Sequence, residues 1–271
     1  MSVHPQTILS IDLPFNEKLA FYSVAFGSDG PEIAVTAGFY GDEHNGLYVC
    51  YKLIEFLRKV EEGAAPGWRL TGRVKIFPAL NPLGTLTDRR NWPFDQRDIN
   101  RSFPGVASGE TTERIASAVL SALGSCSACI DLYSGSRFFN ELPQVQLYES
   151  VDVPPERTHA FRLPIVWRRS TTPLLSGSLA YNLNRRGVPT FVIKFGSANR
   201  INKFFSQWVF AGIILFLREV NVLEGAGAES HFVPYGLEHL KSIRTVLPDH
   251  VATLTAQDAG LFVADANVGA R

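Results

Sequence analysis

The chain has 271 residues, of which 45% are hydrophobic and 19% charged, enough for one large globular domain with a small appendage. Lysine plus arginine and aspartate plus glutamate each total 26, so the composition lacks the charge excess typical of proteins that bind nucleic acid or anionic membranes. We therefore expect a small-molecule or peptide ligand, and the composition leaves the oligomeric state open.

The sequence shows no recognisable targeting or membrane-spanning segment. Residues 1–10 lack a basic stretch followed by an apolar one, so we expect a cytoplasmic protein. The apolar stretch 204–217 is interrupted by Ser206 and Gln207 and is shorter than the ~20 residues of a membrane span, which favours a buried helix. Cys126 and Cys129 form a Cys-x-x-Cys without a second pair, and we interpret them as small core thiols.

Hydrophobic periodicity predicts strands that alternate with helices, the pattern of an α/β domain with a largely parallel sheet. The expected elements, in chain order, are strands over 7–13, 19–26 and 33–37, a helix over 43–60, a strand over 74–80, a long loop to Gly105, a helix over 111–123, strands over 128–132 and 144–148, a helix over 178–186, a strand over 190–195 and a helix over 202–222.

The C-terminal part has a different composition. Residues 225–230 are rich in glycine and alanine, as linkers are, and strand-like runs follow at 245–247, 251–255 and 260–264. We therefore predict an α/β domain over residues 1–224 and a small C-terminal β region over 225–271.

Three loops directly after predicted strands carry unusual polar sequences: 38–46, 81–105 and 131–135. In an open α/β sheet, ligands bind beyond the carboxyl ends of the strands, so these loops are the candidate site. The second loop contains Asn81-Pro82 and ends in Asp-Ile-Asn-Arg-Ser-Phe-Pro-Gly at residues 98–105.

With these loops and residues 179–196, the chain resembles the succinylglutamate desuccinylase/aspartoacylase family, within the wider group of zinc carboxypeptidases. The resemblance covers most of the chain. It implies a three-layer carboxypeptidase-like α/β fold with a mostly parallel mixed central sheet. It also implies amide-bond hydrolysis with zinc as the cofactor.

Three of the four positions that define the reaction in this family are substituted here, and only the glutamate at Glu43 is kept. The resemblance places the zinc ligands, a histidine and a glutamate in a His-x-x-Glu turn and a histidine ending Asp-Leu-His, at Tyr40, Glu43 and Tyr133, and it places the general base at Lys194. Catalytic zinc needs about three protein ligands, and a phenol with a pKa of ~10 must lose its proton to coordinate well. We therefore expect no zinc of the usual kind and no other cofactor.

The second loop keeps the groups that the resemblance assigns to the substrate. Asn100 and Arg101 match the pair that holds the substrate carboxylate, a task that suits the two-pronged guanidinium. Arg90, or alternatively Arg89, resembles the arginine that polarises the scissile carbonyl.

Formal charge suggests how the substituted site is arranged. We expect the Lys194 ammonium to form an ion pair with Glu43 and hydrogen bonds with the hydroxyl oxygens of Tyr40 and Tyr133. A buried charge is tolerated when it is paired and hydrogen-bonded. Other interpretations remain: Glu43 as a helix cap, the tyrosines as ordinary aromatics at strand ends, and Lys194 as a Schiff-base or general-base lysine.

Acidic residues beside these positions are expected to support them. Asp131 is placed to hold Tyr133 or its loop, and Asp95 and Asp98 with Arg97 form a charged turn that braces the second loop.

Three functions compete at this point. The first is a metal-independent descendant of the family, a pseudoenzyme or an enzyme of altered chemistry, that binds a carboxylate-bearing amino-acid-like or peptide ligand. The second is a working metal-dependent amidohydrolase or carboxypeptidase whose non-standard metal site combines Glu43 with groups such as Asp42 or His44. The third is a non-catalytic subunit of an active relative.

Overall fold

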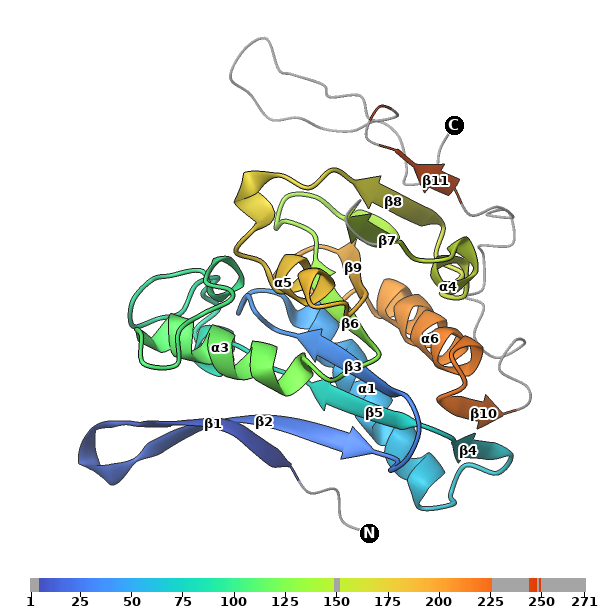
Figure 1. Cartoon of the computed structure of the whole chain (residues 1–271), viewed down its shortest axis with the longest axis horizontal. Helices are drawn as coiled ribbons and strands as arrows, with labels where there is room; N and C mark the ends of the chain where they lie inside the picture. The colour runs from blue at the N-terminus through green and yellow to red at the C-terminus, as the bar shows by residue number, and fades with distance from the viewer. Residues whose placement is uncertain (1–4, 149–151, 226–243, 248, 250–271) are drawn as a thin grey trace.

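The computed structural model describes residues 5–148, 152–225, 244–247 and 249. Within these ranges the chain forms a nine-stranded mixed sheet with helices on both faces, and a separate two-stranded sheet (Figure 1). The strands are β1 (Gln6–Asp12), β2 (Lys18–Phe26), β3 (Glu32–Ala37), β4 (Trp68–Leu70), β5 (Arg73–Phe77), β6 (Ala128–Ser134), β7 (Glu141–Tyr148), β8 (Ile165–Arg169), β9 (Thr190–Gly196), β10 (Leu223–Gly225) and β11 (Arg244–Val246). The α-helices are α1 (His44–Glu61), α2 (Pro82–Leu86), α3 (Thr111–Leu123), α4 (Pro155–His159), α5 (Leu179–Arg185) and α6 (Lys203–Glu219).

The large sheet has the strand order β1-β2-β5-β3-β6-β9-β7-β8-β11. Its centre, β5-β3-β6-β9, is parallel throughout. Strands β2 and β7 run antiparallel to the two outer members of this block, and β8 runs parallel to β7. The carboxyl ends of β5, β3, β6 and β9 therefore meet at one edge of the sheet. The loops singled out from the sequence lie at the ends of β3, β5 and β6.

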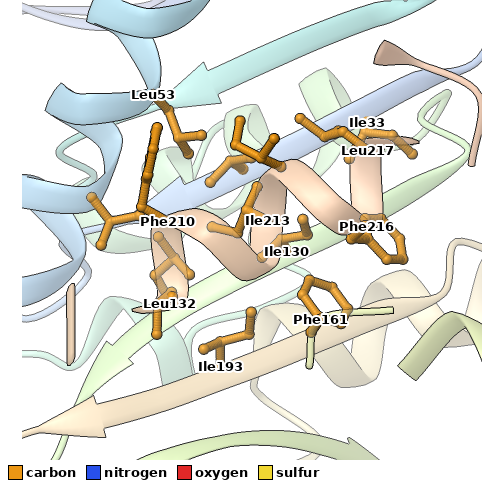
Figure 2. Packing of buried hydrophobic residues seen from close by; sticks show 14 of the residues in the cluster. Ile33, Leu53, Ile130, Leu132, Phe161, Ile193, Phe210, Ile213, Phe216 and Leu217 are labelled. Carbon is orange, nitrogen blue, oxygen red and sulfur yellow. The ribbon is translucent and has the colours of Figure 1, made fainter. Parts of the chain in front are cut away.

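One face of the sheet packs against α1 and α6, which also contact each other. Figure 2 shows α6 laid across the strands, with Ile213 above Ile130 and Phe216 beside Phe161. The rings of Phe161 and Phe216 are stacked with their centroids 4.4 Å apart. The apolar stretch 204–217 is thus a buried helix, as its composition predicted.

The opposite face packs against α3 and α5, and it carries the polar side chains of the site. Cys129, Asp131 and Tyr133 alternate along β6 toward this face, because successive side chains of a strand point to opposite sides. Cys126 and Cys129 are free, buried thiols, as expected.

Close backbone contacts fix the turn after β3. Gly38 has φ +73°, a conformation that favours glycine, and it redirects the chain away from the strand. Gly41 lies directly against the backbone of Gly84 in α2, and its N–H donates to the carbonyl of Arg89 at 3.1 Å. The first and second loops are therefore held together by backbone contacts.

The α/β fold class and the largely parallel mixed sheet are confirmed, and the predicted strands and helices that fall on described residues are present. The sequence analysis missed the short elements β4, β8, β10, α2 and α4, because segments of three to five residues show no clear period. The run at 245–247 corresponds to β11, which joins the main sheet beside β8. The predicted strands over 251–255 and 260–264 lie outside the described residues, and the division at residue 225 stays a prediction.

No helix in the described ranges combines the length and the apolar character needed to cross a membrane.

Candidate functional site

A cavity of about 310 Å³ opens at the carboxyl ends of β3, β6 and β9. All seven side chains predicted from the sequence line it, together with others from β7 and β8. The lining residues are Tyr40, Glu43, Arg90, Asn100, Arg101, Tyr133, Ser134, Gly135, Ser136, Gln146, Tyr148, Arg169, Leu175, Val192 and Lys194.

Glu43 is the most unusual of these residues, because its carboxyl group is buried without a full set of partners. It precedes α1 as the N-cap residue, but its side chain makes no capping hydrogen bond. Only 4% of the residue is exposed, and Oε2 has no hydrogen-bond partner among the described residues. Burial raises the pKa of Glu43 well above its usual range, although the backbone of Ser134 and the charge of Arg90 act in the opposite direction.

The hydroxyls of the two tyrosines that the resemblance placed at zinc-ligand positions both donate to carboxylates. Tyr40 donates to Asp98 Oδ2 at 3.1 Å, and Tyr133 donates to Asp131 Oδ2 at 2.7 Å. Burial, together with these neighbouring carboxylates, raises the pKa of both phenols above the ordinary value. Both side chains therefore stay neutral phenols whose protons are donated to aspartates.

The expected pairing of Lys194 with Glu43 is wrong. Lys194 Nζ lies 2.7 Å from Glu141 Oε1, a carboxylate at the start of β7. Antiparallel pairing of β7 with β9 brings Glu141 opposite Gly196, two residues beyond Lys194 on β9. The expectation that the two tyrosine hydroxyls support Lys194 is also wrong, since they donate to aspartates. The charge of Lys194 is balanced by Glu141 of β7, a residue that the sequence-based charge argument did not consider.

A chain of hydrogen bonds continues from this ion pair across β7 to β8. Gln144 Nε2 donates to Glu141 Oε2 at 3.1 Å, and Gln146 Nε2 donates to Gln144 Oε1 at 3.2 Å. Arg169 Nη1 then donates to Gln146 Oε1 at 3.0 Å. Glu141, Gln144, Gln146 and Arg169, called the β7–β8 ladder below, link Lys194 to a second cation of the cavity.

Arg90 and Arg101 reach the cavity from the second loop. The Arg90 guanidinium lies 3.6 Å from the centre of the Tyr40 ring, a cation–π contact. Asn100 is buried, and its Oδ1 accepts a hydrogen bond from the backbone N–H of Leu179 at 2.9 Å. This bond fixes the backbone that carries Arg101. Arg89 is absent from the described lining of the cavity, and its backbone carbonyl accepts the hydrogen bond from Gly41 N–H.

The acidic residues predicted to support the site do so. Asp131 accepts from Thr36 Oγ1 at 2.6 Å as well as from Tyr133, and burial raises the pKa of Asp131 to about 7. Asp95 accepts from the backbone of Arg97 at 3.0 Å, and Asp98 caps the short turn at Ile99–Arg101. Asp98 also holds Tyr40, a contact that the sequence analysis did not anticipate.

The sequence analysis missed the contributions of β7 and β8. Gln144, Gln146 and Tyr148 alternate along an otherwise apolar strand and are all buried, a polar period-2 pattern that signals a functional or networked face. Arg169 was missed together with its strand, because β8 was not recognised.

Comparison with known proteins identifies the architecture. A model of the family described as "Succinylglutamate desuccinylase/Aspartoacylase catalytic domain" matches residues 29–207. The chain belongs to this family. The match includes every site residue named above, from Tyr40 to Lys194 and the β7–β8 ladder.

Similar proteins include a deacetylase, a structure that carries the family's name and an ectoine utilization protein. An N-alpha-acetyl-L-2,4-diaminobutyric acid deacetylase of Halomonas elongata is 35% identical over 116 residues, which are 42% of this chain and 32% of that protein. A succinylglutamate desuccinylase/aspartoacylase structure from Rhodobacter sphaeroides has a TM-score of 0.69 at 22% identity, covering 86% of this chain and 66% of that one. The product-bound ectoine utilization protein EutE (DoeB) of Ruegeria pomeroyi has a TM-score of 0.71 at 20% identity, covering 90% and 70%.

These comparisons establish a hydrolase family and its fold for this chain. The match to the Halomonas protein spans only about a third of that relative, and the chain spans about two thirds of the Rhodobacter structure. Within the succinylglutamate desuccinylase/aspartoacylase fold, the cavity at the carboxyl ends of β3, β6 and β9 is where this chain gathers its buried carboxyl and its cations.

Proposed function

We propose that this family member binds a carboxylate-bearing amino-acid-like or peptide ligand in the cavity, without the family's zinc and without hydrolysing it. The observation that carries the proposal is Glu43, a buried carboxyl with an unpartnered Oε2 in a cavity that Arg90, Arg101 and Lys194 also line. A carboxyl group that keeps its proton is a hydrogen-bond donor, and guanidinium groups bind carboxylates through two parallel hydrogen bonds. Together they suit an anionic ligand.

The donor set does not suit zinc. A catalytic zinc site takes about three nitrogen, sulfur or carboxylate ligands. Of the three family positions, Glu43 supplies a carboxyl, whereas Tyr40 and Tyr133 supply phenols whose protons are committed to Asp98 and Asp131. Among the residues that the structure describes, no cluster of three or more histidine, cysteine, aspartate or glutamate side chains is arranged to hold a metal ion.

The position of the family's general base supports the same proposal. A base must accept a proton from water, but Lys194 stands there as an ammonium paired with Glu141 at 2.7 Å. The lysine is held by Glu141, and the hydroxyls of Tyr40 and Tyr133 donate to aspartates, so none of the three replaces the family's carboxylate base. Binding without amide hydrolysis is the function that this arrangement supports best.

The test measures metal content and ligand binding on the same protein. Metal analysis of protein purified without chelator should find no stoichiometric metal. Titration calorimetry with N-acylated amino acids and short peptides should find saturable binding that EDTA leaves unchanged and that Arg101→Ala abolishes. Arg97→Ala is the matched control, because Arg97 is an exposed arginine of the same loop outside the described lining of the cavity.

Two results would overturn this proposal. Stoichiometric metal that is lost in Glu43→Gln would show a working metal site. Absence of saturable binding across the whole ligand panel would show that the cavity does not recognise carboxylates.

A further inference from the structure

Lys194 occupies the middle of the cavity. Its strand, β9, is the central one in the order β3-β6-β9-β7-β8, the strands whose ends carry the cavity lining. Register places Tyr133 of β6 and Gln144 of β7 directly beside it, and Val192, two residues earlier on β9, points to the same face. The lysine side chain is 33% exposed and lines the cavity, so a ligand that enters can reach its amine.

Glu141 gives this amine a proton acceptor. Its Oε1 lies 2.7 Å from Lys194 Nζ, and its Oε2 accepts from Gln144, which holds the carboxylate in one orientation. Proton transfer along the first contact yields a neutral amine beside a carboxylic acid. A neutral amine is a nucleophile, and the acid can return the proton to a leaving oxygen. The pair therefore supplies the two functions that condensation of an amine with a carbonyl group requires.

Arg101 determines which carbonyl compound fits the cavity. Its charge acts on Tyr40, which follows β3, and on Tyr148, at the end of β7. Since β9 lies between β3 and β7 in the sheet, this places Arg101 in the part of the cavity that also holds Lys194. The cavity measures about 310 Å³, so a ligand of a few carbon atoms can contact both side chains. A guanidinium binds a carboxylate, so the carbonyl compound that fits is an acid.

We propose that Lys194 forms an imine with an oxo acid, a ligand whose carboxylate is held by Arg101 and whose aldehyde or ketone carbon reaches Nζ. This inference rests on the proposed function, since the carboxylate lies at the same site. The Nζ lone pair attacks the carbonyl carbon, and two protons pass from the nitrogen to the carbonyl oxygen with Glu141 as their carrier. The C=O bond is replaced by C=N, and the oxygen leaves as water. The protonated imine keeps the positive charge of the ammonium, so it remains paired with Glu141.

Borohydride, which reduces an imine to a stable amine, traps the adduct. The wild-type protein is incubated with pyruvate or levulinate, which differ in the separation of carbonyl and carboxylate, and is then reduced, digested and analysed by mass spectrometry. At least one of the two should add the mass of the acid, less one oxygen atom, at Lys194. Acetone and 2-pentanone, their counterparts without a carboxylate, should label Lys194 about ten- to a hundredfold more slowly, the range expected for one hydrogen-bonded charge.

Three variants assign the reaction to the pair. Lys194→Arg keeps a cation beside Glu141 but cannot condense, so the label should disappear from a protein that circular dichroism shows to be folded. Glu141→Gln keeps the amine and removes the proton carrier, and it should slow labelling about a hundredfold or more. Lys203→Arg is the matched control, because Lys203 is an exposed lysine at the start of α6, outside the described lining of the cavity. It should leave the labelling of Lys194 unchanged.

The outcomes separate this inference from the proposed function. Absence of a label at Lys194 with both oxo acids, or labelling no faster than at Lys203, would overturn the inference, and faster labelling in Glu141→Gln would overturn the role given to Glu141. Binding of N-acetylglutamate that depends on Arg101, without a trapped adduct of either oxo acid, would leave the proposed function intact and refute the chemistry of Lys194. Failure of every carboxylate to bind and of both oxo acids to react would refute both.

Discussion

Asp131 gives the most direct quantitative check on the electrostatics of the site. Its carboxyl is buried beneath Tyr133, and burial raises its pKa from 3.8 to about 7, although the hydrogen bonds from Thr36 and Tyr133 oppose the change. Between these two pH values the folded protein holds a proton that the unfolded chain has released. Unfolding then releases protons, so stability is fully present below about pH 4 and falls as the pH rises toward 7.

The size of the effect follows from the shift. Each pKa unit corresponds to about 1.4 kcal/mol, so about three units give roughly 4 kcal/mol between pH 4 and pH 7. Asp131→Asn cannot titrate, and its amide oxygen can still accept from Thr36. We therefore expect the variant to gain stability relative to the wild-type protein by about 3 kcal/mol between pH 5 and pH 7.

Urea unfolding at half-unit pH intervals, followed by far-UV circular dichroism, measures the difference between the two proteins. Other titrating groups, including Glu43, contribute to both proteins and cancel in this difference. Asp152→Asn, at an exposed position before α4, controls for the loss of one carboxylate from the chain. A difference between Asp131→Asn and the wild-type protein that stays constant with pH would refute the assignment of a raised pKa to this group.

Three further predictions concern the rest of the site. Glu43→Gln should flatten the pH dependence of N-acetylglutamate binding, because the wild-type carboxyl has a raised pKa and repels the ligand once the pH rises enough to ionise it. Calorimetry that finds the same change of affinity with pH in the variant and the wild-type protein would contradict this. Lys194→Met and Glu141→Gln should each destabilise the protein by about 1 kcal/mol in urea, a modest amount for a partly exposed pair, and the double variant should lose less than the sum. Gly41→Ala should destabilise by about 1–3 kcal/mol or more, because a Cβ there would overlap the backbone of Gly84, and wild-type stability would contradict the contact.

Long periodic segments explain why so much of the fold could be predicted. The helix over 43–60 and the buried strand at 33–37 each carry enough apolar residues to define a period, and both appear close to their predicted bounds. The family motif then located Tyr40 and Lys194 on loops or strand ends that meet in space. Strand β8 could not be predicted in this way, because it has only five residues and two of them are arginines.

Partner choice within the site depended on strand register, which the sequence did not reveal. Nothing in the residues around Lys194 indicates that β7 runs antiparallel to β9 and brings Glu141 within 2.7 Å of the ammonium. The charge argument therefore predicted Glu43, an acidic residue of the family motif, as the partner of Lys194. The partner of Tyr40 was missed because Asp98 reaches it from a loop 58 residues away, whereas Asp131, two residues from Tyr133, was predicted to hold that tyrosine.

The observed pairing changes the charge argument for the whole cavity. With Lys194 paired with Glu141, Glu43 forms no ion pair with a cation among the described residues, and burial raises its pKa, which favours the neutral carboxyl. Arg101 and Arg169 then supply positive charge that no acidic partner among the described residues offsets by an ion pair. A cavity that was expected to balance its own charges instead carries an excess of cations, and the anionic ligand proposed above would complete that balance.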